Sequence, residues 1–319
     1  MLRVSVIVGL IVMAGKLAIA ATPQSVAVDG PAIWVAGGES DNIVQFDLKT
    51  GAATVVAKLP NDSQPRALAV NERGRVFVSL SGKKKNVVTL VKSRPNLPDS
   101  PLVPVDFTPT IGRYGPGRMA FDHNGLLNIA GDTERLILQY NVETGEAVEP
   151  IKPGRKANLV GLTAHGGTLF VAEYFQKSVL RLDLTATPVK AVPLLHGEGL
   201  LDRPHGMAIG HNGHLFVSNL KDDRVLELDP LSGKIVHVFL DVKTIGARCV
   251  NDLRYSRRLD HYFISSGDTV YEVASDGTLV ARFSSPALSD AQSILVFPAD
   301  DPVPVQREAS VVEATRSEE

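Results

Sequence analysis

The sequence predicts an all-β protein, a six-bladed β-propeller of four-stranded antiparallel blades. Three observations lead to this prediction. One apolar position recurs at intervals of 42 to 51 residues, each repeat contains short runs of alternating apolar and polar residues, and glycine-containing turns separate the runs. The recurring position is occupied by Val26, Leu68, Met119, Leu162, Met207 and Leu253. Repeats of this length are typical of propellers, whereas a parallel β-helix has far shorter ones.

The second half of each repeat carries a hairpin. Four segments align without a gap, namely residues 35–51, 129–145, 171–187 and 217–233. Within them, residues 43–48 and 225–229 alternate with the period of two expected of half-buried strands. A turn follows each of these runs, and Gly51 and Gly233 stand where a positive φ costs glycine little.

A further strand pair precedes each hairpin. Apolar runs over residues 65–70, 117–121, 160–164 and 205–209 lead into polar turns that contain Gly74, Gly125, Gly166 and Gly213. The next strand follows at once, as in residues 214–217. The unit is therefore four consecutive strands. Stacking such units around an axis buries both faces of every blade and shields most strand edges.

The fifth unit resembles an NHL-type repeat. The resemblance is carried by residues 203–210 (RPHGMAIG), 214–219 (HLFVSN) and 224–229 (RVLELD). Gluconolactonases of the senescence-marker type resemble the chain in fold, and the streptogramin B lyase family is also similar in blade sequence. The likeness extends over about residues 23 to 285 and implies a six-bladed propeller. It implies no single function, because the same fold carries hydrolases, lyases and binding modules.

The chain divides into three predicted regions. We expect a signal peptide over residues 1–20, one propeller domain over residues 21–298 and a flexible tail over residues 299–319. Residues 291–296 echo residues 23–28. Two arrangements remain open for this segment: it closes the ring as a latch between the first and last blades, or it lies outside the ring.

The N-terminal residues predict export. Arg3 precedes an apolar run over residues 4–14, and small residues lead to a cleavage site after Ala20. The run is shorter than the ~20 residues of a spanning helix, so we expect no stable membrane insertion. The single cysteine, Cys249, excludes a disulfide within the chain. Export without disulfides favours a periplasmic or secreted bacterial protein, and we expect Cys249 to be buried.

The overall charge excludes one class of partner. Lys and Arg number 33 and Asp and Glu 35, which gives a formal net charge of -2. No overall field therefore attracts nucleic acid, and we expect none as a partner. We interpret the basic run at residues 83–85 as a solvated loop. The expected partner is a small-molecule ligand or a protein segment at the propeller rim.

The candidate binding residues lie where the innermost strands begin. The aligned repeats place Gln24, Arg66, Gly117, Val160, His205 and Asn251 at equivalent positions, with Arg118 and Asp252 beside two of them. Because strand ends of this kind meet at a propeller axis, we expect the polar members to converge. Arg66 and Arg118 would then hold a carboxylate or phosphate, and His205 would transfer a proton. The alternative is that these groups line a water-filled channel.

Two function classes remain open. The first is a ligand-binding or protein-binding scaffold of the cell envelope. The second is a metal-assisted, lactonase-like hydrolase or lyase acting at the central funnel. Its catalytic candidates are His205 and Asp252, and Asn251 and Asp252 are its candidate ligands for a divalent cation, Ca²⁺ or Mg²⁺.

The family resemblances bear on this second class. Likeness to gluconolactonases implies a cation held by one Glu, two Asn and one Asp, and residues 248–252 are similar to one of those ligand segments. Gln24 stands where the glutamate is wanted, and an amide weakens such a site. Likeness to streptogramin B lyases implies a paired His and Glu, which no blade start carries. Neither resemblance therefore completes a catalytic set.

Overall fold

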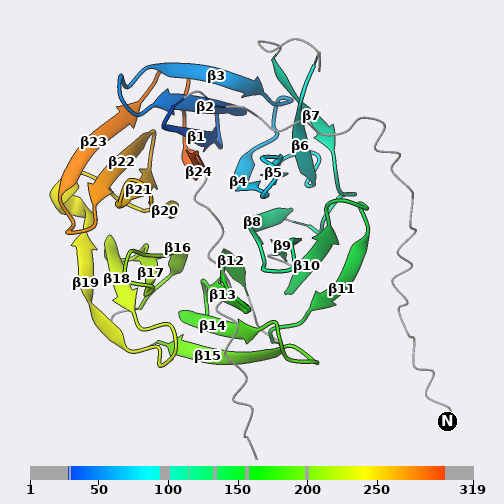
Figure 1. Cartoon of the computed structure of the whole chain (residues 1–319), viewed down its shortest axis with the longest axis vertical. Coiled ribbons are helices and arrows are strands. Elements are labelled where there is room, and N and C mark those ends of the chain that lie inside the picture. Colours follow the sequence, from blue (N-terminus) through cyan, green and yellow to red (C-terminus); the bar gives the residue numbers. More distant parts are fainter. Residues whose placement is uncertain are drawn as a thin grey trace, which may run out of the picture.

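The computed structural model describes residues 28, 30–93, 101–113, 115–131, 135–154, 158–197 and 201–298. These residues form strands β1 to β24 and one short 3₁₀ helix, η1 (Val242–Ile245), and they contain no α-helix. The sheets surround a central axis in a propeller arrangement (Figure 1). Within the described ranges no helix has the length and apolarity to cross a membrane. The predicted signal peptide and tail lie outside the described residues.

Four sheets contain four consecutive strands each, joined antiparallel. Two of them comprise β8 (Pro116–Phe121), β9 (Leu126–Gly131), β10 (Leu136–Asn141) and β11 (Ala147–Ile151), then β12 (Leu159–His165), β13 (Thr168–Glu173), β14 (Ser178–Asp183) and β15 (Lys190–His196). The others comprise β16 (Pro204–Ile209), β17 (Leu215–Asn219), β18 (Arg224–Leu228) and β19 (Ile235–Asp241), then β20 (Asp252–Ser256), β21 (His261–Ser266), β22 (Thr269–Ala274) and β23 (Leu279–Ser284). The first strand of each lies nearest the axis (Figure 1).

The remaining strands belong to one eight-stranded sheet, in the order β24-β1-β2-β3-β7-β6-β5-β4. They are β1 (Ala32–Gly37), β2 (Asn42–Asp47), β3 (Ala53–Lys58), β4 (Pro65–Val70), β5 (Val76–Leu80), β6 (Val87–Lys92), β7 (Leu102–Asp106) and β24 (Ala291–Phe297). β3 and β7 meet in parallel at a single residue pair, Ala57 and Leu102. The sheet thus consists of two four-stranded antiparallel halves.

The last strand, β24, lies inside the ring beside the first. It pairs antiparallel with β1, where Ile294 stands opposite Val35, and it also contacts β4 and β20. Its residues Ala291, Ser293 and Ile294 are buried. Of the two open arrangements for this segment, the structure therefore adopts the latch. The strand predicted around Val26 lies outside the described residues, and β24 occupies the innermost place of this half-sheet (Figure 1).

Apolar side chains fill the space between neighbouring sheets. Phe216 of β17 packs against Tyr262 of β21, with ring centroids 4.8 Å apart. Because each sheet is covered on both faces, middle strands such as β5 and β17 are buried throughout. The outermost strands face solvent, and Val148 of β11 and Val280 of β23 remain exposed. Packing between neighbouring sheets therefore fixes the positions of the strands around the axis.

Cys249 departs from its predicted burial. It is exposed, in the loop between η1 and β20, with a φ of 51°. Its backbone N–H donates to Oδ1 of Asp223 at 2.8 Å. The positive φ of this turn places the side chain at the surface, and no sequence pattern predicts such a turn here. The prediction of a buried thiol is wrong.

Candidate functional site

A pocket opens on the axis where the innermost strands begin, and we refer to it as the axial pocket. Its volume is about 250 Å³. It is lined by Gln64, Arg66, Ser81, Lys85, Gly115, Pro116, Gly117, Arg118, Leu159, Val160, His205 and Gln292. Most of these residues belong to the starts of β4, β8, β12, β16 and β24 or to the loops before them. These are the strand ends that the aligned repeats single out.

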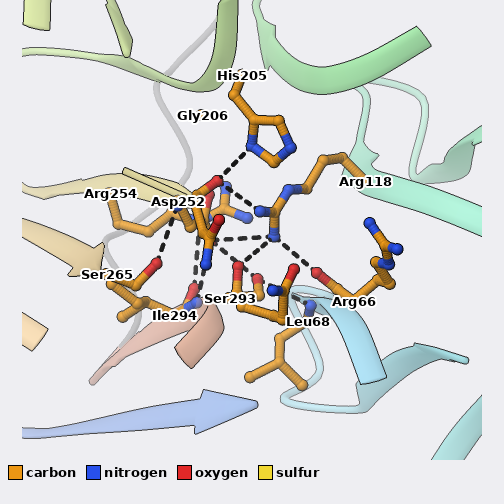
Figure 2. Close-up of polar contacts among 12 residues, drawn as sticks. Arg66, Leu68, Arg118, His205, Gly206, Asp252, Arg254, Ser265, Ser293 and Ile294 are labelled. Atoms are coloured by element: carbon orange, nitrogen blue, oxygen red, sulfur yellow. Dashed lines mark hydrogen bonds and ion pairs between the residues drawn. The ribbon is translucent and has the colours of Figure 1, made fainter. Parts of the chain in front are cut away.

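Arg118 of β8 forms the centre of the pocket floor (Figure 2). The residue is only 4% exposed. Its guanidinium donates to the carbonyl oxygens of Arg66 at 2.7 Å and Gln292 at 2.6 Å, and to that of Asn251. One side chain therefore ties β8 to β4, to β24 and to the residue before β20. Burial lowers the pKa of Arg118 to about 10, so it stays charged at neutral pH.

Asp252 of β20 supplies the negative charge of the floor. Its Oδ2 accepts from the Ser293 hydroxyl at 2.9 Å and from the Ile294 N–H at 3.0 Å. The same oxygen lies 3.3 Å from Nε of Arg254 and 3.8 Å from Nη1 of Arg118. Burial opposes ionisation of this carboxyl, but the charges of Arg254 and Arg118 and the hydrogen bonds from Ile294 and Ser293 together outweigh it and lower the pKa of Asp252. The buried carboxylate thus faces two cations and accepts two hydrogen bonds.

His205 of β16 forms one wall of the axial pocket. Its Nδ1 lies 2.7 Å from the carbonyl oxygen of Asn251, the same oxygen that Arg118 binds. Burial, and then the charge of Arg118, lower the pKa of His205 to about 3. The ring is therefore neutral at neutral pH and is a weak base. The side chain of Asn251 turns away and donates to the carbonyl of Ala291 at 3.2 Å.

Two cations stand at the rim, which we define as Gln64, Arg66 and Lys85. Arg66 is exposed, and its Nε donates to the Ser81 hydroxyl at 3.1 Å. Nζ of Lys85 donates to the carbonyl of Arg113. The lining of the axial pocket, as the structure describes it, contains no Asp or Glu. Its interior is therefore electropositive.

A second pocket of about 370 Å³ adjoins the first, and we refer to it as the acidic pocket. It shares Gln64, Arg66 and Gln292 with the axial pocket and adds the carboxylates of Glu39, Asp41, Asp62 and Asp290. Asp41 accepts from the backbone N–H of Asp62 and of Gln64. Asp62 pairs with Lys83 at 2.7 Å. The mouth thus has a cationic and an anionic half, with Arg66 between them.

Comparison with known proteins identifies the architecture. No family model matches the chain, and no curated protein matches it in sequence. Among solved structures, a chain of a nidogen/laminin complex is 12% identical with a TM-score of 0.67, over 84% of this chain and 98% of its own. A protein of unknown function from Bacteroides caccae is 14% identical with a TM-score of 0.62, over 84% and 98%. A streptogramin B lyase structure is 15% identical with a TM-score of 0.57, over 82% of each chain. This chain is a β-propeller.

The predicted resemblance is thereby confirmed as a likeness of fold. Identities this low carry the propeller architecture and leave its chemistry to the residues of the site. Within this propeller, Arg66, Arg118 and His205 line one pocket, as the aligned repeats predict. Asn251 joins them through its carbonyl oxygen. Binding of a ligand by these residues stays a prediction.

Gln24 lies outside the described residues. Gln292, at the start of β24, lines the axial pocket where Gln24 was expected. The echo between residues 23–28 and 291–296 is the signal that finds it. The aligned repeats place Gln24 at the axis, and that placement stays a prediction.

Lys85 is the pocket residue that sequence reasoning missed most clearly. Its neighbours behave as a solvated loop, because Lys83 pairs with Asp62 and Lys84 with Asp106. Lys85 instead adopts a φ of 51° and reaches the axial pocket. Nothing in a run of three lysines distinguishes the one that turns inward.

The predicted metal ligands, Asn251 and Asp252, both have protein hydrogen-bond partners. Oδ2 of Asp252 is held by Ser293 and Ile294, and the Asn251 amide donates to a carbonyl oxygen. Among the residues that the structure describes, no three His, Cys, Asp or Glu side chains are placed to hold a metal ion. Dependence on a divalent cation stays a prediction of the enzyme alternative.

Proposed function

We propose that the chain is an exported, six-bladed β-propeller that binds an anionic ligand at the mouth of its axial pocket. The ligand is a small molecule or an acidic segment of a protein, and the protein acts as a binding scaffold of the cell envelope. Export rests on the signal-like residues 1–20. The count of six blades treats the two halves of the eight-stranded sheet as separate blades, since one residue pair joins them.

The observation that carries the proposal is the charge of the axial pocket. Arg66 and Lys85 stand at its rim, Arg118 lies beneath, and its lining contains no Asp or Glu among the described residues. A concave site of one charge sign raises the local concentration of oppositely charged ligands. Small-molecule sites are typically concave, partly apolar and fitted with few polar groups, and here Leu159 and Val160 form the apolar part.

The two arginines contribute to anion binding in different ways. Both Nη atoms of Arg118 donate to backbone carbonyls, so this residue contributes its charge from below. Arg66 is exposed and forms no ion pair with a described residue, while its Nε donates to Ser81. Direct, charge-assisted hydrogen bonds to a carboxylate or phosphate therefore fall to Arg66, with Lys85 as a second donor.

The test measures binding of citrate and of inorganic phosphate by isothermal titration calorimetry at low ionic strength. Arg66→Ala should weaken the tighter of the two by about tenfold, because it removes a charged hydrogen-bond donor. Arg73→Ala is the matched control: Arg73 is also exposed, but it lies in the turn between β4 and β5, at the opposite end of these strands. Failure of both anions to bind, or equal losses in the two variants, would contradict the proposal.

The second candidate function is a metal-assisted, lactonase-like hydrolase or lyase at the same funnel. Its support is the position of His205 in the pocket wall, although a lowered pKa makes this ring a weak base at neutral pH. The discriminating measurement is the thermal midpoint of the protein with Ca²⁺, Mg²⁺ or Zn²⁺. A rise that disappears in Asn251→Ala favours the enzyme, and indifference to all three ions favours the binding protein.

A further inference from the structure

We infer that the axial pocket selects anions that also carry a hydrogen-bond donor, a hydroxyl or N–H next to the acidic group, because His205 presents an acceptor there. The inference deepens the proposed function and rests on it. It names a ligand class: compact hydroxy acids or acylated amino acids, and hydroxylated phosphates. Plain carboxylates and simple alkyl phosphates of the same charge would bind more weakly.

The first step is the tautomer of His205. Its Nδ1 lies 2.7 Å from the carbonyl oxygen of Asn251, and a carbonyl oxygen only accepts hydrogen bonds. Nδ1 therefore carries the ring proton, and Nε2 of the neutral ring is left with a lone pair. Arg118 binds the same carbonyl oxygen and keeps it in place (Figure 2). The polar floor thereby dictates which nitrogen of His205 is an acceptor.

The second step is what remains free on the ring. Within the described part of the chain, Nε2 of His205 has no hydrogen-bond partner, whereas Nδ1 is fully engaged. The residue is partly exposed and lines the axial pocket. Nε2 is thus the atom of His205 that can accept a hydrogen bond from a ligand. A ligand that covers it without a donor leaves it unpaired, which is unfavourable in a partly dry site.

The third step is the contrast with the other polar groups of the pocket. Arg66 and Lys85 only donate. The Ser81 hydroxyl is already used, since it accepts from Arg66 and donates to the carbonyl of Gln64. Gln292 directs its amide Nε2 to both carboxylate oxygens of Asp290. The amide oxygens of Gln64 and Gln292 are further acceptors of the lining. Anion donors therefore stand at the rim, and His205 adds an acceptor at the wall whose orientation the floor fixes.

The fourth step is size. The pocket holds about 250 Å³, and Leu159 and Val160 are among the residues that line it. Sites for drug-sized ligands begin at roughly 300 Å³. A compact acid with its donor one or two atoms from the anionic group suits a pocket of this volume.

The experiment compares ligands matched in charge at pH 8, above the ordinary pKa of histidine, so that the ring is neutral in every case. L-malate and D-malate are titrated against succinate, and glycerol 3-phosphate against propyl phosphate, by calorimetry. We expect the better malate enantiomer and the hydroxylated phosphate to bind about tenfold more tightly than their partners. In His205→Leu that preference should fall to about twofold or less while binding of succinate persists.

His123→Gln is the matched control, because His123 is exposed in the turn at the other end of β8 and lines neither mouth pocket. It should leave the preference unchanged. Long-range ¹H–¹⁵N correlation of the His205 imidazole in the unmodified protein gives an independent reading, and we expect the proton on Nδ1. This measurement decides the matter should His205→Leu fail to fold.

The outcomes separate the inference from the function on which it rests. Equal affinity for malate and succinate, or a proton on Nε2, would overturn the inference and leave the anion site standing. Absence of binding by all five compounds would remove the proposed function, and the inference with it. A preference that survives in folded His205→Leu would also overturn the assignment of His205.

Discussion

The floor and the rim of the axial pocket each contain an arginine, and the two arginines have opposite environments. On the floor, Arg118 is buried and its donors are taken by the carbonyls of two other strands and of the residue before β20. At the rim, Arg66 is exposed and donates to one hydroxyl. Arg66 is the second residue of β4 and Arg118 the third of β8. A difference of one strand position separates a residue that holds the ring together from one that is available to a ligand.

This difference teaches that charge at a propeller axis has two separable roles. A buried guanidinium is stable only where carbonyls and a carboxylate compensate the loss of water, as Asp252 and the strand-end carbonyls do here. Such a residue is committed to the fold. An exposed guanidinium keeps its donors free, and its replacement costs the protein little folding stability. Substitutions on the floor should therefore lower the stability of the protein, and substitutions at the rim should weaken ligand binding.

The largest expected effect is a loss of stability on replacement of Arg118, on the floor. Arg118→Met leaves three carbonyl oxygens with one donor fewer each and removes one of the two cations that face Asp252, in a buried setting. We expect the free energy of unfolding to fall by about 3 kcal/mol, the lower end for a broken buried ion pair, because Arg254 still faces Asp252. Urea unfolding followed by circular dichroism measures it. Arg66→Met is the control and should stay within about 0.5 kcal/mol; equal losses would erase the contrast.

A smaller effect with a pH signature should come from Asp252. Its folded-state pKa lies below the ordinary 3.8, so its contribution to stability is fully present above that value. The contribution is lost as the pH falls through the folded-state pKa. Asp252→Asn should destabilise the protein at pH 7 by about 2 kcal/mol, through weaker charged hydrogen bonds. Urea midpoints of the two proteins should converge below pH 4, and a gap that stays constant down to pH 2.5 would contradict this.

Local patterns explain how much of this architecture the sequence predicts. Alternation within residues 43–48 and the glycine turns act over a few positions, so the strands and their order could be derived. The convergence of strand starts followed from the repeat. The burial of Arg118 could not, because its partners lie 52, 133 and 174 positions away. The inward turn of Lys85 depends on a single backbone angle. Long-range hydrogen bonds and single backbone φ angles therefore decide which polar side chains at the axis are available to a ligand.

The smallest effect should come from the anionic half of the mouth. Asp62 lines the acidic pocket, which shares Arg66 with the axial pocket, and it is exposed beside Lys83. Asp62→Asn removes a charge that repels an anion at Arg66 and frees Lys83 from its partner. We expect citrate to bind about twofold more tightly at 20 mM salt, a magnitude typical of exposed charges. Calorimetry at 1 M salt should show no difference, since the screening length there is about 3 Å.

The control for that measurement is Glu72→Gln, an exposed acid in the turn at the opposite end of β4. It changes the net charge equally but lines neither mouth pocket, so a simple effect of total charge would appear in both variants. A gain confined to Asp62→Asn and abolished by salt would show that the two halves of the mouth act on one ligand. A gain of equal size in both variants would mean that the acidic pocket is only part of the general surface charge.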